Sequence, residues 1–227
     1  MRAALTAHPV TLSVSDPTRG TPVRLRMTTY QLGEVLWLAR YTPALAALLP
    51  LDLHAAEAGN YAPLAGQFLL IDRLYSGAVA AGMNNTVVCS EDVPFYRMSA
   101  QQRAAMCRTF LGLAPLRDLA TVCKRWPRGP VAADFHAPLH SNVPVLLLSG
   151  SNDPITPPRY AAEAARGYPH SLDLVVPGFG HGQLLDPCVG GLMARFIARA
   201  SVRGLNTDCI RRLHPPPFFL TLNGPGP

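Results

Sequence analysis

The sequence predicts an α/β protein with about three parallel strands, and two observations carry this prediction. Short apolar runs at residues 85–89, 143–148 and 172–176 end in turn-forming or acidic residues, as strands buried in a sheet do. Helical segments separate the runs, and parallel strands require such crossovers because the chain must return to the same end of the sheet. We therefore expect a small parallel sheet with flanking helices.

Length and composition indicate one globular core. The chain has 227 residues, of which 48% are hydrophobic, so it can bury a sizeable core. Its apolar stretches are far shorter than the roughly 20 residues of a membrane helix. The N-terminus also lacks the order of basic, apolar and small residues that defines a signal peptide. We expect no membrane partner and no signal peptide in this chain.

The net charge of +6 does not indicate nucleic-acid binding. Twenty basic residues outnumber fourteen acidic ones, but they are scattered along the chain and accompany no nucleic-acid-binding motif. His136 and His140 have the i, i+4 spacing of metal ligands on a helix, yet Pro138 between them disfavours that helix. We expect no nucleic-acid partner, no metal and no cofactor.

Residues 1–84 are expected to form a hairpin and a helical lid segment. Apolar residues alternate over 10–14 and 23–27, on either side of a turn-rich stretch, which predicts the hairpin. The pattern becomes helical at Thr28, where Gln31 completes a capping box. Prolines cut the later helical pieces, which are expected over residues 44–49 and 64–81. This block would cover the carboxyl ends of the strands, where open α/β sheets bind ligands.

Residues 85–212 are expected to form the C-terminal part of an α/β core, with a helical insertion over 95–125. Ser99 and Gln102 begin a helix in this insertion with a second capping box. After the last predicted strand, apolar residues spaced three and four apart predict an amphipathic helix. Residues 213–227 form a proline-rich tail, which we expect to be extended.

An acid and a histidine follow two successive predicted strands. Asp153 lies on the turn after the run at 143–148, and His181 follows the next strand in the sequence. α/β-Hydrolases present the last two members of a Ser, Asp, His triad in this order. For Asp153 alone, an N-cap of the next helix is the favoured interpretation, but its pairing with His181 favours the triad interpretation.

The serine of such a triad is missing. No Gly-x-Ser-x-Gly occurs in the 227 residues. Ser149 and Ser151 belong to the turn before Asp153, where hydroxyls normally bond the backbone. Without a serine hydroxyl the histidine has nothing to deprotonate, so we expect this chain alone to be inactive.

Four motifs, in their order and spacing, resemble the secreted tripeptidyl aminopeptidase-like α/β-hydrolases. They are residues 85–92, 123–127, 144–158 and 178–182. The resemblance implies a partial α/β-hydrolase fold with a helical lid, in a serine hydrolase that releases short N-terminal peptides and has relatives acting on esters. It implies Asp153 as the triad acid, His181 as the triad base, and a secreted or periplasmic location.

The chain departs from this family because the first strands, the oxyanion-hole loop and the nucleophile elbow would precede the lid. It resembles the C-terminal half of such an enzyme. The expected partners are a peptide or small ester substrate in the complete enzyme, and the missing N-terminal half. The alternative is a non-catalytic remnant or binding module whose helical lid holds a small apolar ligand or a partner.

Glu91 and Asp92 are candidate substrate-binding residues. They follow the predicted strand at 85–89, and an aminopeptidase needs a carboxylate to bind the free α-ammonium group of its substrate. A solvated loop or a helix N-cap explains the same two acids and is the favoured interpretation, because acidic residues are common ahead of helices.

Five cysteines suggest two disulfides and one free thiol, a pattern of exported proteins. We hypothesise a bridge between Cys188 and Cys209, which flank the last helix, so that the tail is tied to the core. A second bridge would join Cys89 to Cys123, near the end of the helical insertion. Cys107 would remain free.

Overall fold

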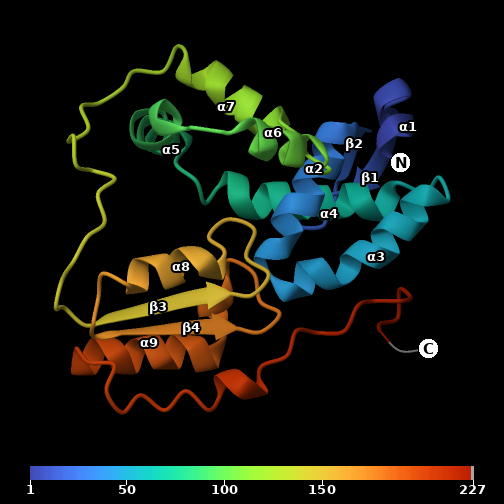
Figure 1. The fold of residues 1–227 in the computed structure, drawn as a ribbon. Coiled ribbons are helices and arrows are strands. Elements are labelled where there is room, and N and C mark those ends of the chain that lie inside the picture. Colours follow the sequence, from blue (N-terminus) through green and yellow to red (C-terminus); the bar gives the residue numbers. More distant parts are fainter. Residues whose placement is uncertain (226–227) are drawn as a thin grey trace. The chain divides into compact units, whose positions relative to one another are not determined.

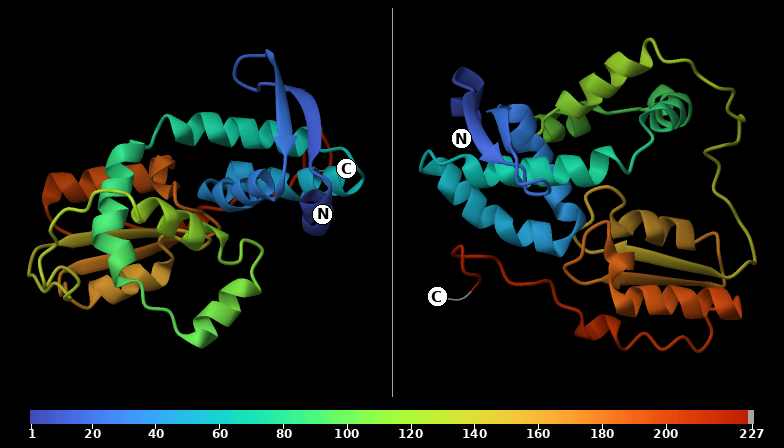
Figure 2. Two further views of the ribbon diagram at one scale, coloured as in Figure 1. Left: turned by 90° about the horizontal axis from the view of Figure 1, so that it is seen from above. Right: turned by 180° about the vertical axis from the view of Figure 1, so that it is seen from behind.

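The computed structural model describes residues 1–225, which form two compact units. The major unit combines residues 1–71 with the chain from residue 138 onward, and the minor unit comprises residues 72–137. Figure 1 shows the order of the elements along the chain, and Figure 2 gives two further views of them. No helix in the described residues has the length and apolar character needed to cross a membrane.

The major unit begins with helix α1 (Arg2–Ala7) and an antiparallel hairpin of β1 (Val10–Ser15) and β2 (Pro22–Met27). Val14 lies opposite Val23, so the apolar residues that alternate along one strand face those of the other strand. The Asp16 carboxylate holds the turn by accepting hydrogen bonds from the Thr18 N–H and hydroxyl, at 2.8 and 2.7 Å. The hairpin therefore forms where the alternation of the sequence predicts it.

Three helices follow the hairpin, and the second runs longer than the sequence predicts. They are α2 (Thr29–Leu38), α3 (Pro43–Glu57) and α4 (Ala62–Ser76), with the 3-10 turn η1 (Ala39–Tyr41) after α2. The capping box of Thr28 and Gln31 starts α2. Pro50 was expected to end the helix, but α3 continues through it. Tertiary packing explains this, because Leu45 and Ala56, on either side of Pro50, are both buried.

The regular elements of the minor unit are all helical, which corrects the prediction of a strand at 85–89. Its elements are α5 (Ala81–Val87), the π-helical turn η2 (Val88–Asp92), the 3-10 turn η3 (Val93–Phe95), α6 (Ala100–Cys107) and α7 (Ala114–Cys123). Sequence periodicity cannot distinguish a short apolar run in a strand from one in a helix. The Thr86 hydroxyl donates to the Gly82 carbonyl one turn earlier, at 2.9 Å, as on a helix.

The parallel sheet consequently has two strands in the described residues rather than three. Strand β3 (Val145–Gly150) pairs with β4 (Ser171–Val176), with Leu148 opposite Leu174. Helix α8 (Pro158–Ala165) is the crossover, and α9 (Pro187–Arg199) follows β4 and the 3-10 turn η4 (Gln183–Leu185). Figure 1 shows α8 and α9 flanking the strand pair. Val176, Val189, Leu192 and Ile210 form the buried core under α9.

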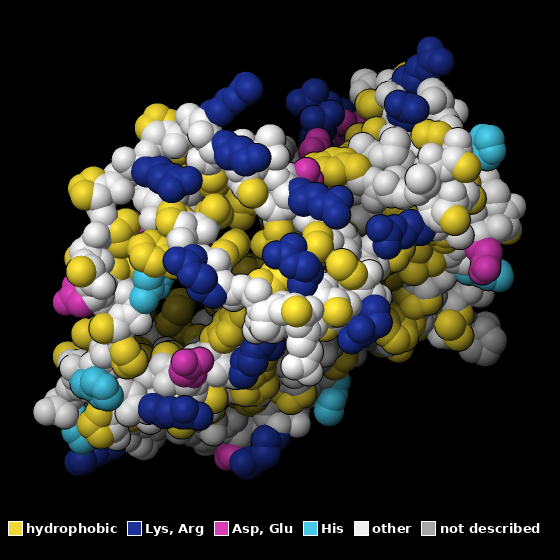
Figure 3. Space-filling model, turned by 45° about the horizontal axis from the view of Figure 1, so that its top comes forward, with side chains coloured by type: hydrophobic (Ala, Val, Ile, Leu, Met, Phe, Trp, Pro, Cys, Tyr) yellow, Lys and Arg dark blue, Asp and Glu magenta, His cyan; other side chains and the backbone are white. Residues whose placement is uncertain are grey.

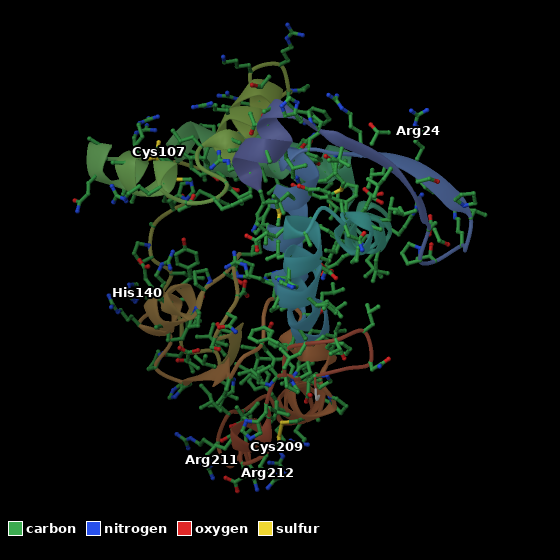
Figure 4. All side chains as sticks on the ribbon, turned by 90° about the vertical axis from the view of Figure 1, so that its right-hand side faces the viewer. Arg24, Cys107, His140, Cys209, Arg211 and Arg212 are labelled. Carbon is green, nitrogen blue, oxygen red and sulfur yellow. A yellow bond between two sulfur atoms is a disulfide. The ribbon has the colours of Figure 1, made fainter. Side chains whose placement is uncertain are left out.

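Two disulfides join the cysteine pairs that the sequence hypothesis names. Cys188 is bonded to Cys209, with Cα atoms 6.0 Å apart, just before the 3-10 turn η5 (Ile210–Arg212). Cys89 is bonded to Cys123 within the minor unit, with Cα atoms 5.1 Å apart. Cys107 is a free, exposed thiol, labelled in Figure 4.

The tail after η5 has no helix or strand in its described part, up to residue 225. The Phe219 N–H donates a hydrogen bond to the Ala47 carbonyl at 2.9 Å, which ties the tail to α3. Residues 226 and 227 of the predicted tail lie outside the described part.

On the face shown in Figure 3, the basic side chains lie among apolar ones rather than in one continuous stripe.

Candidate active site

Asp153 lies on the loop that follows β3, with its side chain fully buried. Its Oδ1 atom accepts hydrogen bonds from the N–H groups of Ile155 and Thr156, at 2.8 and 3.0 Å. Its Oδ2 atom accepts one from the Thr156 hydroxyl at 2.9 Å. Asp153 therefore organises its own loop. It does not cap α8, since the N-cap position of that helix is Pro157.

His181 lies on the loop that follows β4 and meets Asp153 directly. Its Nδ1 atom is 2.9 Å from Asp153 Oδ2 and 3.2 Å from the Thr156 hydroxyl oxygen. A carboxylate at Nδ1 favours the tautomer that carries its proton on this nitrogen, which leaves Nε2 free to accept a proton. The His181 side chain is 38% exposed, whereas the Asp153 side chain is 0% exposed. The acid is thus shielded while the imidazole stays accessible.

The surroundings of Asp153 favour its ionised form. Burial by itself raises the pKa of this carboxyl. Hydrogen bonds from the Thr156 N–H, His181, the Ile155 N–H and the Thr156 hydroxyl together outweigh burial, so the pKa lies below its ordinary value. Asp153 is therefore a carboxylate at neutral pH and can stabilise a protonated imidazole.

Two glycines let the histidine loop approach the end of β3 on one side and η1 on the other. A Cβ atom on Gly150, the last residue of β3, would overlap the backbone carbonyls of Phe179 and Gly180. A Cβ atom on Gly180 would overlap the carbonyl of Arg40 in η1. Only residues without a side chain fit this close backbone approach. The contact at Gly150 brings the strand that precedes Asp153 against the loop that carries His181.

The 3-10 turn η1 contacts the histidine loop. The Tyr41 ring meets the His181 ring edge-on, with centroids 5.2 Å apart, and the Tyr41 carbonyl accepts from the Gly182 N–H at 2.9 Å. The sequence reasoning missed both Tyr41 and Thr156. A threonine three residues after a loop aspartate is a pattern that would have indicated the bonds made by Thr156. No sequence signal points to Tyr41, because only tertiary packing brings it to His181.

A cavity of about 980 Å³ lies next to the Asp153 loop in the major unit. Asp153 is among the residues that line this cavity, whereas His181 is not. Residues along one face of α3 form a wall, and the proline-rich tail forms another. The lining comprises Arg40, Pro43, Ala46, Ala47, Leu49, Pro50, Leu53, Ser151, Asn152, Asp153, Gly178, Pro215, Pro216, Pro217 and Phe218.

Glu91, Asp92 and Ser151, which the sequence also suggests as possible site residues, do not take part in the contact between Asp153 and His181. Glu91 and Asp92 lie partly buried in the π-helical turn η2 of the minor unit, not past the end of a strand as the sequence suggested. The Ser151 hydroxyl accepts a hydrogen bond from the Gly178 N–H at 2.8 Å, and so bonds the backbone. Among residues 1–225, no three His, Cys, Asp or Glu side chains gather as metal ligands would.

Comparison with known protein families matches residues 110–209 to a family of α/β-hydrolases described as TAP-like protein. The matched residues include both parallel strands, Asp153 and His181. Searches of curated proteins and of solved structures found no match.

Proposed function

We propose, from the premise that residues 110–209 belong to the TAP-like family of α/β-hydrolases, that this chain supplies the acid and the base of a serine hydrolase. The proposed substrate is a peptide from which short N-terminal pieces are released, with small esters as a second class. The observation that carries the proposal is the contact of a fully buried Asp153 carboxylate with the Nδ1 atom of an accessible His181.

The geometry supports a definite role for each residue. Asp153 holds the imidazole with its proton on Nδ1, so that Nε2 can take the proton of a serine hydroxyl as that oxygen attacks the substrate carbonyl. The resulting imidazolium is stabilised by the carboxylate, and it then donates the proton to the leaving amine or alcohol. Thr156 holds the carboxylate through its N–H and hydroxyl.

The serine must come from sequence outside these 227 residues, because they contain no Gly-x-Ser-x-Gly. The proposed partner is therefore a polypeptide that carries the nucleophile and the oxyanion donors, as the N-terminal half of an enzyme of this family does. If the DNA immediately upstream encodes an in-frame Gly-x-Ser-x-Gly, the complete enzyme would be restored. Its absence there would favour a non-catalytic remnant.

The imidazole tautomer tests the acid and base assignment without requiring activity. In the unmodified chain, the ¹⁵N shifts of the neutral His181 imidazole should show a protonated Nδ1 and an unprotonated Nε2. Asp153→Asn should shift the population toward the other tautomer, because the carboxamide can donate to Nδ1.

Asp186→Asn is the matched control for this experiment. Asp186 accepts from the Cys188 N–H at 2.8 Å as the N-cap of α9, and asparagine is an equally good N-cap. The His181 shifts should therefore not change in this variant. An Asp153→Asn variant with unchanged His181 shifts would contradict the proposal.

A second candidate function is a binding module for a small apolar ligand, and the cavity along α3 favours it. Its volume is within the range of about 300–1,000 Å³ common for ligand sites. Pro43, Ala46 and Pro50 place small or rigid side chains along one face of α3. An apolar fluorophore such as anilinonaphthalene sulfonate would report occupancy of the cavity.

Ala46→Phe, which fills the cavity, should weaken binding of the fluorophore at least tenfold. Ala44→Phe adds the same ring to the same helix at an exposed residue outside the lining, and should leave binding unchanged. Equal binding by both variants would place the fluorophore elsewhere and remove this candidate.

We also propose that the protein is exported to an oxidising compartment. Two disulfides support this, because such bonds form and persist outside the reducing cytosol. Mass spectrometry of the alkylated protein purified from its native source should find Cys107 modified and the other four cysteines unmodified. Alkylation of all five would contradict export.

A further inference from the structure

A second pocket lies wholly within the minor unit, among η3, α6 and α7, which Figure 1 locates. Its volume is about 400 Å³, and it shares no lining residue with the cavity along α3. The lining comprises Val93, Tyr96, Met98, Arg103, Leu113, Leu116, Arg117 and Ala120. It therefore combines apolar side chains with two arginines and contains no acidic residue.

Helix α7 supplies an apolar wall of this pocket. Leu113, Leu116 and Ala120 are spaced three and four residues apart, so they lie on one face of the helix. All three are only partly buried, and so is Met98. Water that contacts these side chains would be released by an apolar ligand, which favours binding.

A disulfide holds the walls of the pocket together. Helix α7 contacts η3, the turn that contributes Val93. Cys123 at the end of α7 is bonded to Cys89 in η2, the turn directly before η3. The two elements are thus linked covalently close to the pocket. A site whose walls are already fixed costs less ordering free energy when a ligand binds.

The two arginines come from different helices and have no acidic partner. Arg103 lies on α6 and Arg117 on α7, and both are exposed. In the described part of the chain, neither guanidinium forms an ion pair. A guanidinium group can donate two parallel hydrogen bonds to one carboxylate. Two unpaired positive charges on one small pocket therefore favour an anionic ligand.

We propose that this pocket binds a monocarboxylic acid with an unbranched apolar chain of medium length. The chain would lie against the apolar face of α7, and the carboxylate would pair with Arg103 and Arg117. A neutral apolar ligand would leave the arginines unpaired, and an inorganic anion would leave the apolar wall in contact with water. The volume is at the lower end of the range of about 300–1,000 Å³ common for ligand sites, so it suits one chain.

This binding site goes beyond the proposed hydrolase function and does not rest on it. Asp153 and His181 belong to the major unit, whereas every residue of the pocket belongs to the minor unit. Loss of the triad contact would therefore leave the pocket unchanged.

Octanoate is the probe for the site. An NMR titration of the purified full chain should show saturable shifts of the α7 amides, among them Leu116 and Ala120. Octylammonium has the same chain with the opposite charge, and acetate has the same carboxylate without the chain. Each should bind about tenfold more weakly than octanoate, because each makes only part of the contacts.

Replacing the arginines tests the charged part of the site. Arg103→Gln and Arg117→Gln should each weaken octanoate binding about fivefold or more, because each removes a charge-assisted hydrogen bond. Arg108→Gln is the matched control. Arg108 is exposed at the C-cap of α6 and lies outside the pocket, so its replacement removes the same charge and should leave binding unchanged.

Filling the pocket tests its apolar part. Ala120→Phe should weaken octanoate binding about tenfold, because the ring would occupy the space of the chain. Ala114→Phe adds the same ring to the same helix at an exposed residue outside the lining, and should leave binding unchanged. If Ala120→Phe fails to fold, the arginine variants still decide, since Arg103 and Arg117 are exposed and have no ion-pair partner to lose.

Four results would overturn the proposal. The first is the absence of saturable octanoate binding. The second is octylammonium binding as tight as that of octanoate, which would show adsorption of any amphiphile. The third is equal weakening by Arg103→Gln and Arg108→Gln, which would assign the effect to net charge. The fourth is shifts on α3 without shifts on α7, which would place octanoate in the other cavity. The response of the His181 tautomer to Asp153→Asn is independent of all four.

Discussion

At the scale of single residues, two buried carboxyl groups differ because of their partners. Asp153 has four hydrogen-bond donors, which hold its pKa below the ordinary value despite burial. Asp52 on α3 is 6% exposed, and burial raises its pKa from 3.8 to about 6. Asp153 is ionised at neutral pH because its hydrogen-bond donors stabilise the carboxylate, whereas ionisation of the buried Asp52 destabilises the folded state.

Asp52 should make the protein less stable as the pH rises. Its pKa is higher in the folded than in the unfolded state, so its stabilising contribution is full below about pH 4 and is lost as the pH rises through about 6. Asp52→Asn should therefore increase the free energy of unfolding at pH 8 by about 1–2 kcal/mol relative to its effect at pH 4. Urea unfolding at both pH values measures this.

Glu57→Gln, on an exposed residue of the same helix, is the control for the removal of a charge. A pH response in this variant as large as that of Asp52→Asn would assign the effect to net charge rather than to burial. Asp153 should change the pH dependence of stability in the opposite direction. Its pKa is lowered in the folded state, so its stabilising contribution is present above its ordinary pKa and is lost as the pH falls below that value.

At the scale of elements, the sequence predicts correctly where helices with a capping box begin, but it does not predict the structure of a short apolar run without such a cap. The capping boxes at Thr28 and Ser99 begin α2 and α6 as predicted, because side-chain caps act within one turn. The run at 85–89 carried no comparable signal and became helical. Asp153 and His181 could be located because the ends of successive parallel strands lie together, whereas the approach of η1 to His181 depends on packing that no local pattern encodes.

The disulfide between Cys188 and Cys209 should increase the free energy of unfolding of the protein. These residues are 21 positions apart, and a loop of this size contributes on the order of 3 kcal/mol by restricting the unfolded chain. The double variant Cys188→Ala, Cys209→Ala should lower the free energy of unfolding by about 2–4 kcal/mol in urea titrations. Cys107→Ser, at an exposed free thiol, should change it by less than about 0.5 kcal/mol. Similar losses in both variants would contradict a specific role for the bridge.

At the scale of the whole molecule, the contact of Asp153 with His181 lies beside a parallel sheet of two strands in the described residues. The minor unit exposes large apolar side chains, among them Met83, Phe95 and Phe135. Apolar surface of this kind marks places where a partner binds or where chains aggregate. The minor unit therefore presents apolar surface of this kind.

The purified chain should not hydrolyse aminoacyl or peptidyl p-nitroanilides or short-chain esters above background. Its 227 residues contain no Gly-x-Ser-x-Gly, the motif that would supply a serine for His181 to deprotonate. The His181→Ala variant should give the same rate in a continuous absorbance assay. Strong turnover that disappears in His181→Ala would refute the missing-nucleophile argument and require a search for another serine or cysteine.

The distribution of cysteines between the units has a consequence for oxidative folding. Cys188 and Cys209 are the only two cysteines of the major unit in the described residues, so within that unit their pairing has no competitor. The minor unit holds Cys89, Cys107 and Cys123, and three thiols allow three alternative bridges. Scrambled isomers should therefore arise chiefly in the minor unit during refolding from the reduced state. Replacing Cys107 with serine would leave a single pairing within each unit and should simplify production of homogeneous protein.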